Sequence, residues 1–315
     1  MDRDDLYKIV SHSNLTTSQT EQLLNGQIYQ QKKDWQKFLN LAFITLGLGF
    51  TVAGIVFFFA YNWDDLPKFV KLGLTELLLI ATTVIALMPK FSSLIRNMVL
   101  TGAAMLVGVL FAVFGQIYQT GANAYDFFLA WTLFVSLWVL VANFAPLWLL
   151  FLTLINTTFI LYTQQVARDW DEMLIITLLF VFNAFTLILA ITLPKLFKKE
   201  VLPNWFLYTI ALAAVIFATF GISMGILNDD PSFFSLLIIL TSGLYTLGLR
   251  YGFMVKNIFY LAIIAFSLIV ILSVGLVELS NGAGMFLLVS LFNVISISVV
   301  IKVLLDLKKK WNHDQ

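Results

Sequence analysis

Ten long apolar runs, separated by short polar segments, dominate this sequence and restrict what it can fold into. A bilayer core of about 30 Å requires roughly 20 apolar residues in a helix. The runs are continuously apolar and do not alternate, so they predict helices and not barrel strands. We therefore expect an all-α integral membrane protein with about ten transmembrane helices. The runs are Phe38–Ala60, Phe69–Met88, Met98–Tyr118, Phe127–Ala142, Leu147–Gln164, Met173–Leu193, Trp205–Leu227, Phe233–Leu249, Ile258–Glu278 and Met285–Leu307.

Composition supports lipid as the main solvent and narrows the chemistry. Hydrophobic residues make up 60% of the chain and charged residues 12%, far from the balance of soluble domains. The formal net charge of +1 does not favour a nucleic-acid partner. The chain has no cysteine, and its two histidines, His12 and His313, lie in polar terminal segments. We therefore expect neither a metal nor a cofactor.

The fourth and fifth runs have the weakest boundary, because only Asn143-Phe144-Ala145-Pro146 separates them. Proline suits the first turn of a helix, where its missing N–H would have no partner in any case. This segment therefore predicts a tight helical hairpin and not one kinked span.

The positions of the basic residues predict the orientation. With ten spans, all of the 19 Lys and Arg residues except Lys68, Lys71 and Arg168 fall on the side of the N-terminus. Cytoplasmic loops carry the excess of Lys and Arg, so we expect both termini in the cytoplasm. An error of one helix would destroy this asymmetry. The localisation that we expect is a bacterial cytoplasmic (inner) membrane.

Two polar segments flank the transmembrane domain of residues 38–307. Residues 1–37 predict a cytoplasmic helical hairpin, in which Thr16 and Gln19 have capping-box spacing. Its apolar stripe fits either contact with a partner or membrane surface, or burial of the two short helices against each other. Residues 308–315 form a basic tail. Its run Lys308–Lys310 fits attraction of anionic lipid and ordinary positive-inside anchoring equally well.

Three segments of the first half resemble the DUF2157 family of polytopic membrane proteins. They are Leu15–Leu24, Ala60–Pro67 with its Ala-Tyr-Asn-Trp sequence, and Gly115–Gly121 continuing to Asp126–Trp131. The resemblance covers about the first 145 residues, and beyond them it extends only to hydropathy. It implies the fold but no activity. It also implies another membrane protein as a partner, because family members are often encoded beside one.

Topology places the polar motifs of the first four spans at one outer face. The first and third spans both leave the membrane outward, and Glu76 lies about 10 Å below that surface at 1.5 Å per residue. A carboxylate at the centre of a span costs roughly 2.5–3.5 kcal/mol, so it normally faces a polar partner or water. We expect a small outward-facing ligand site in which Glu76 binds a proton, a cation or a polar head group. Its candidate residues are Asn62, Trp63, Glu76, Gln116, Tyr118, Gln119, Asp126 and Trp131.

A purely structural interpretation of the same residues stays open. Trp and Tyr at span ends form the ordinary interfacial belt, and Asn, Gln and Glu often join helices by hydrogen bonds. The single amides Asn156, Asn183 and Asn293 favour this second role. Gly221 and Gly225 have the small-xxx-small spacing of closely packed helices.

Three function classes fit this organisation to different degrees. A non-catalytic component that senses, scaffolds, or binds lipid or a partner fits best, because the polar motifs gather in the first four spans. The alternative is a secondary transporter of a small solute or lipid that uses Glu76, and ten spans are compatible with an inverted five-plus-five arrangement. We do not expect an enzyme, because the sequence has no phosphate loop, nucleophile elbow or zinc-ligand spacing.

Overall fold

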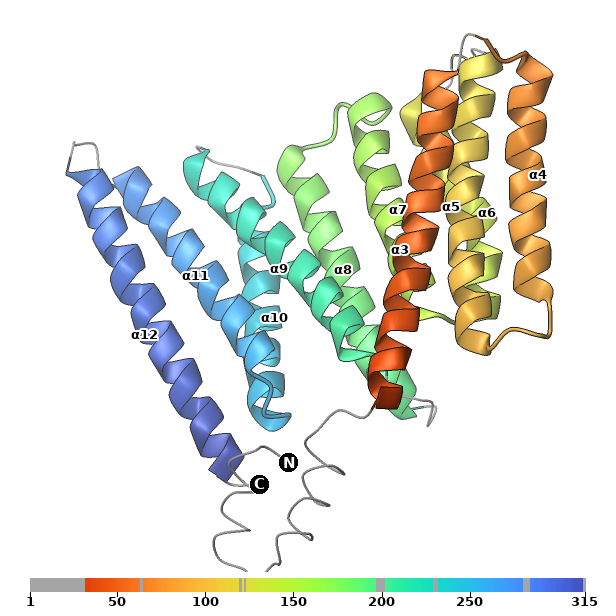
Figure 1. Cartoon of the computed structure of the whole chain (residues 1–315). Coiled ribbons are helices and arrows are strands. Elements are labelled where there is room, and N and C mark those ends of the chain that lie inside the picture. The colour runs from red at the N-terminus through yellow and green to blue at the C-terminus, as the bar shows by residue number, and fades with distance from the viewer. Residues whose placement is uncertain are drawn as a thin grey trace, which may run out of the picture. The chain divides into compact units, whose positions relative to one another are not determined.

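The helices of the computed structural model match the predicted spans (Figure 1). The structure describes residues 32–62, 65–118, 121, 123–196, 202–228, 232–279 and 284–313. Ten helices in this part of the chain are long and apolar enough to cross a membrane, which confirms the predicted number. The hairpin predicted for residues 1–37 lies almost entirely outside the described residues. The helices are α3 (Lys32–Tyr61), α4 (Lys68–Leu87), α5 (Ser93–Tyr118), α6 (Ala124–Ala142), α7 (Ala145–Gln165), α8 (Glu172–Leu196), α9 (Asn204–Leu227), α10 (Phe234–Met254), α11 (Ile258–Leu279) and α12 (Met285–His313).

The short connection between α6 and α7 is the hairpin that the sequence predicts. Asn143 ends α6 in the left-handed conformation, with φ 42° and ψ 50°, which asparagine tolerates better than most residues. Its side chain accepts a hydrogen bond from the Trp148 indole at 3.3 Å. Pro146 lies in the first turn of α7. The chain therefore reverses within two residues, and two separate spans result.

The helices form two compact units. Helices α3–α5 and the end of α6, Leu140–Ala142, belong to the first unit. Residues Asn123–Val139, which include most of α6, and α7–α12 belong to the second. The boundary between the two units lies at the start of α6, the fourth span, and not after the fifth span. The five-plus-five arrangement therefore stays a prediction.

In the first unit, small residues of α5 make the core. Ala103 and Ala104 are fully buried, and a Cβ on Gly102 would collide with the side chain of Leu48 from α3. Close approach through small residues is the usual way in which membrane helices pack, because burial of apolar surface gives no advantage over lipid. Helix α5 therefore packs against both α3 and α4.

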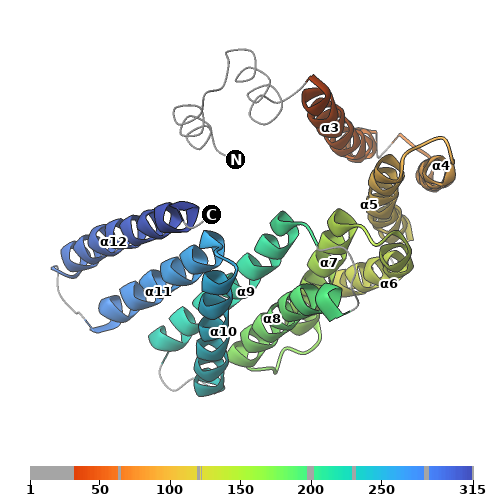
Figure 2. The ribbon, with the colours of Figure 1, turned by 90° about the horizontal axis from the view of Figure 1, so that it is seen from below.

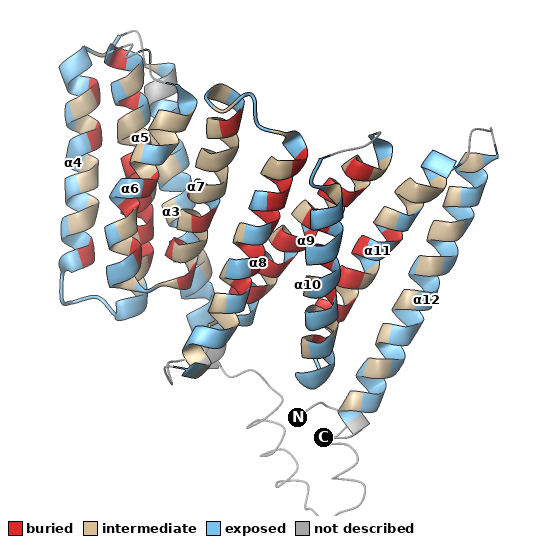
Figure 3. Ribbon diagram, turned by 180° about the vertical axis from the view of Figure 1, so that it is seen from behind, coloured by how far each residue is buried: buried red, intermediate tan, exposed pale blue. Residues whose placement is uncertain are grey.

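In the second unit, α9 is the central helix. Its buried side includes Ala211, Ala214, Ala218, Gly221 and Gly225, at helical spacing. This side gives room for α8, α10 and α11, which all pack against α9. Figure 2 shows these neighbours from below. Within this unit, Figure 3 shows most of the buried residues on α8 and α9, whereas α12 carries exposed and intermediate residues.

Candidate functional site

The first unit holds three described groups of the predicted outer site near one end. Asn62 follows α3, and Gln116 and Tyr118 end α5, at the end of the unit where α4 begins (Figure 1). The Asn62 amide donates a hydrogen bond to the carbonyl of Phe58 in the last turn of α3 at 2.9 Å. Gln116 is exposed, and the exposed ring of Tyr118 packs on Phe114 at 4.6 Å. The predicted residues Trp63 and Gln119 lie outside the described part of the chain.

Glu76 is an exposed side chain of α4. The residues that α4 buries are Lys71, Thr75 and Ala86, and Thr75 donates to the carbonyl of Lys71 at 2.8 Å. Glu76 therefore lies outside the face that packs within the first unit. Its role as an ion or ligand site stays a prediction.

Asp126 and Trp131 belong to the second unit, where both have local structural contacts. The backbone N–H of Asn123 donates to the Asp126 carboxylate at 3.0 Å. Asp126 thus forms a capping box with Asn123 at the start of α6. Trp131 packs against the rings of Phe127 and Phe128, with centroids 5.8 and 5.9 Å apart. The spacing Asn-x-x-Asp before an apolar run would have predicted this cap.

Polar side chains near the middle of the spans pair with one another across helices. Asn183 of α8 donates to the side-chain oxygen of Asn156 of α7 at 2.8 Å. Ser273 of α11 donates to Asn293 of α12 at 2.7 Å. Both pairs also use backbone carbonyls of their own helices, at Leu152, Leu179 and Ile269. The prediction that these three asparagines join helices is confirmed.

A buried hydroxyl cluster joins three helices of the second unit. Ser267 of α11 lies 2.5 Å from the Tyr245 hydroxyl of α10 and 2.6 Å from the Thr219 hydroxyl of α9. A cavity of about 510 Å³ lies between the same helices and is lined mainly by apolar side chains. Thr241, 2% exposed, also lines it, and its hydroxyl has no hydrogen-bond partner among the described residues.

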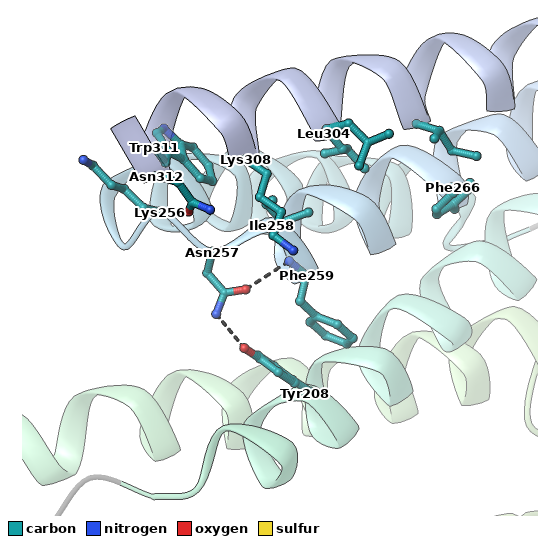
Figure 4. Close-up of a pocket in the computed structure, with 12 residues that line it drawn as sticks. Tyr208, Lys256, Asn257, Ile258, Phe259, Phe266, Leu304, Lys308, Trp311 and Asn312 are labelled. Atoms are coloured by element: carbon teal, nitrogen blue, oxygen red, sulfur yellow. Dashed lines mark hydrogen bonds between the residues drawn. The ribbon is translucent and has the colours of Figure 1, made fainter. Parts of the chain in front are cut away.

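A second cavity, of about 600 Å³, lies where α9 and α11 begin and α10 and α12 end (Figure 4). We call it the basic pocket. Its polar lining residues are Tyr208, Lys256, Asn257, Lys308, Trp311 and Asn312. The sequence pointed to Lys308 only as one member of a basic run. Nothing in the sequence indicated that Lys256 and Tyr208 would line the same cavity, because they lie far from Lys308 along the chain.

Asn257 holds one wall of the basic pocket in place. Its amide donates to the Tyr208 hydroxyl at 2.7 Å, and its side-chain oxygen accepts the backbone N–H of Phe259 at 3.0 Å (Figure 4). The rings of Tyr208 and Phe259 stack with centroids 4.1 Å apart. The start of α11 is therefore fixed to α9 at this point.

Comparison with known proteins supports the family resemblance and adds no activity. Residues 9–148 match the family described as predicted membrane protein (DUF2157). No curated protein and no solved structure matches the chain. The matched segment includes α3–α6 and ends in the first turn of α7. The hydroxyl cluster and the basic pocket lie beyond it.

Proposed function

We propose that this membrane protein is a non-catalytic component that binds other membrane constituents and carries no solute across the bilayer. The main support is that the polar groups near the middle of its spans hydrogen-bond to each other across helices. Asn156 with Asn183, Ser273 with Asn293, and the Ser267 cluster are such groups. Polar groups that line a transport path must instead face the solute or water.

Helix continuity supports the same proposal. Many secondary carriers hold their substrate between broken helices, whose half-helix ends face the substrate near the middle of the bilayer. Each candidate span among the described residues is one uninterrupted helix.

Exposed Glu76 supports the binding of a partner. An ionised carboxylate facing lipid would cost a few kcal/mol. Since Glu76 lies outside the packed face of α4, we expect a polar surface beyond α3–α5 to cover it. Such a surface suits binding to other membrane constituents.

The proposal predicts that water does not reach the middle of the spans, and cysteine accessibility tests this. Because the chain has no native cysteine, each introduced thiol is the only one in its variant. We expect Thr158→Cys and Thr219→Cys, near the middle of α7 and α9, to resist a membrane-impermeant maleimide in intact and permeabilised cells. Both thiols should react after denaturation in SDS. Reaction of either thiol in the folded protein would contradict the proposal, because it would reveal a water path to the middle of the bilayer.

Two loop positions serve as controls and test the orientation. Ser232 precedes α10 and Ser92 precedes α5, and both are exposed. With cytoplasmic termini, the thiol of Ser232→Cys should react in intact cells. The thiol of Ser92→Cys should react only after permeabilisation. The reverse pattern would invert the proposed topology.

A secondary carrier is the second candidate function, favoured by the exposed carboxylate of Glu76 within span α4. We would impose a pH gradient across vesicles and follow its dissipation. We expect the gradient to decay at the same rate in vesicles with the wild-type protein, in vesicles with Glu76→Gln and in protein-free vesicles. The physical reason is that the proposed component moves no proton. Faster decay with the wild-type protein that Glu76→Gln abolishes would favour the carrier.

A further inference from the structure

The basic pocket has a charged end. Lys308 extends from α12 toward the start of α11, and Lys256 precedes α11 in the chain (Figure 4). Among the described residues that line this pocket, none is acidic. Tyr208 accepts the Asn257 hydrogen bond and keeps its own hydroxyl proton as a donor. The two lysines give this end of the pocket a positive charge, although their ammonium groups point in different directions in Figure 4, and the Tyr208 hydroxyl is a further donor. A positive charge with hydrogen-bond donors suits a phosphate group.

The backbone of Lys256 has a conformation that residues other than glycine rarely adopt. Its φ is +51°, in the left-handed region where glycine is the usual residue at a helix end. The turn is held by bonds from the N–H of Val255 to the Tyr251 carbonyl at 2.9 Å and from the N–H of Asn257 to the Gly252 carbonyl at 2.9 Å. The chain therefore places an ammonium group beside the pocket at a conformational cost that glycine would avoid.

The other end of the basic pocket is apolar and extends along the helices. Phe266, Ile301, Leu304 and Leu305 line it. Phe266 lies eight residues after the first residue of α11, which is about 12 Å along the helix axis. Figure 4 shows Trp311 and Asn312 at one end of the pocket and Phe266 at the other. Polarity thus changes along the pocket as it does along a phospholipid.

We propose that the basic pocket binds an anionic phospholipid, with the phosphate at the end that Lys256 and Lys308 line and an acyl chain along the apolar side chains of α11 and α12. This deepens the proposed function, because it names lipid as one of the bound membrane constituents. Basic pockets between membrane helices on the cytoplasmic side bind anionic headgroups. The helix ends around this pocket lie on the side that the Lys and Arg distribution assigns to the cytoplasm. A free phosphate would leave the apolar half of the pocket unused.

The test is a titration of the purified full-length chain in detergent, with bound lipid counted by native mass spectrometry. Phosphatidylglycerol should bind more tightly than phosphatidylcholine. In the Lys256→Gly/Lys308→Gln variant, the affinity for phosphatidylglycerol should fall by about fivefold per lysine, or about 25-fold in total. Glycine suits the left-handed backbone at position 256, and glutamine is a good helix former at position 308. The variant should therefore fold, which its elution profile and helix content would verify.

Lys309→Gln/Lys310→Gln is the matched control, because it removes the same charge from neighbouring exposed positions that do not line the pocket. This control should keep nearly the full affinity. An equal loss in both double variants would overturn the pocket and indicate general attraction to a basic tail. Equal binding of phosphatidylcholine and phosphatidylglycerol would also overturn it, as would comparable binding of glycerol 3-phosphate, which has no acyl chain. None of these outcomes depends on whether the middle of the spans is closed to water.

Discussion

Replacing Gly221 and Gly225 together with valine should strongly destabilise the second unit. A Cβ on Gly221 would lie 2.6 Å from Leu237 of α10 and 2.7 Å from Ile176 of α8. A Cβ on Gly225 would collide with the ring of Phe234. Since overpacking costs roughly 1–3 kcal/mol per site, the double variant should lose about 2–6 kcal/mol. Detergent-solubilised protein should show a large fall in apparent melting temperature.

Gly243→Val is the control for this prediction. Gly243 lies in α10, and no heavy atom outside its immediate neighbourhood lies within 4 Å of the position of its Cβ. The same glycine-to-valine change is therefore expected to alter the melting temperature little. If Gly221→Val/Gly225→Val were as stable as Gly243→Val, then α9 would not pack closely against α8 and α10 at these two glycines.

The sequence predicted those features that depend on one helix at a time. Apolar length determined the ten spans, and Pro146 marked the start of α7 because its conformation and missing N–H suit a first turn. A single amide inside the membrane needs a hydrogen-bond partner. The sequence therefore predicted that Asn183 joins two helices, but it did not identify Asn156 as the partner. The small-xxx-small spacing of Gly221 and Gly225 also predicted close packing correctly.

Features that depend on which helices are neighbours could not be predicted. The basic pocket unites Tyr208, Lys256 and Lys308 from three parts of the chain, and apolar periodicity does not reveal that α9, α11 and α12 meet there. Asp126 shows a different problem. Its carboxylate suits a ligand site as well as a helix cap, so residue type alone does not decide between them. The Asn-x-x-Asp spacing favours the cap, and the hydrogen bond from the Asn123 backbone N–H identifies it.

Ser267→Ala should destabilise the second unit by roughly 1–2 kcal/mol, because it removes the Ser267 hydroxyl that lies 2.5 Å from the buried Tyr245 hydroxyl. Thr241→Val is the control. It also deletes one buried hydroxyl, but the Thr241 hydroxyl has no partner among the described residues, so this variant should be neutral or slightly more stable. The apparent melting temperatures of the two variants, measured in the same detergent, would check this prediction.

A double variant separates the lost hydrogen bond from a simple change in packing. Removing both partners of a buried hydrogen bond can be nearly neutral, whereas removing one leaves the other desolvated and unpaired. Ser267→Ala/Tyr245→Phe should therefore be more stable than Ser267→Ala alone, while the Thr219 hydroxyl keeps its bond to the Val215 carbonyl at 2.6 Å. If the two substitutions were additive and each destabilising, then packing of the side chains, and not the hydroxyl cluster, would join α10 to α11 at this depth.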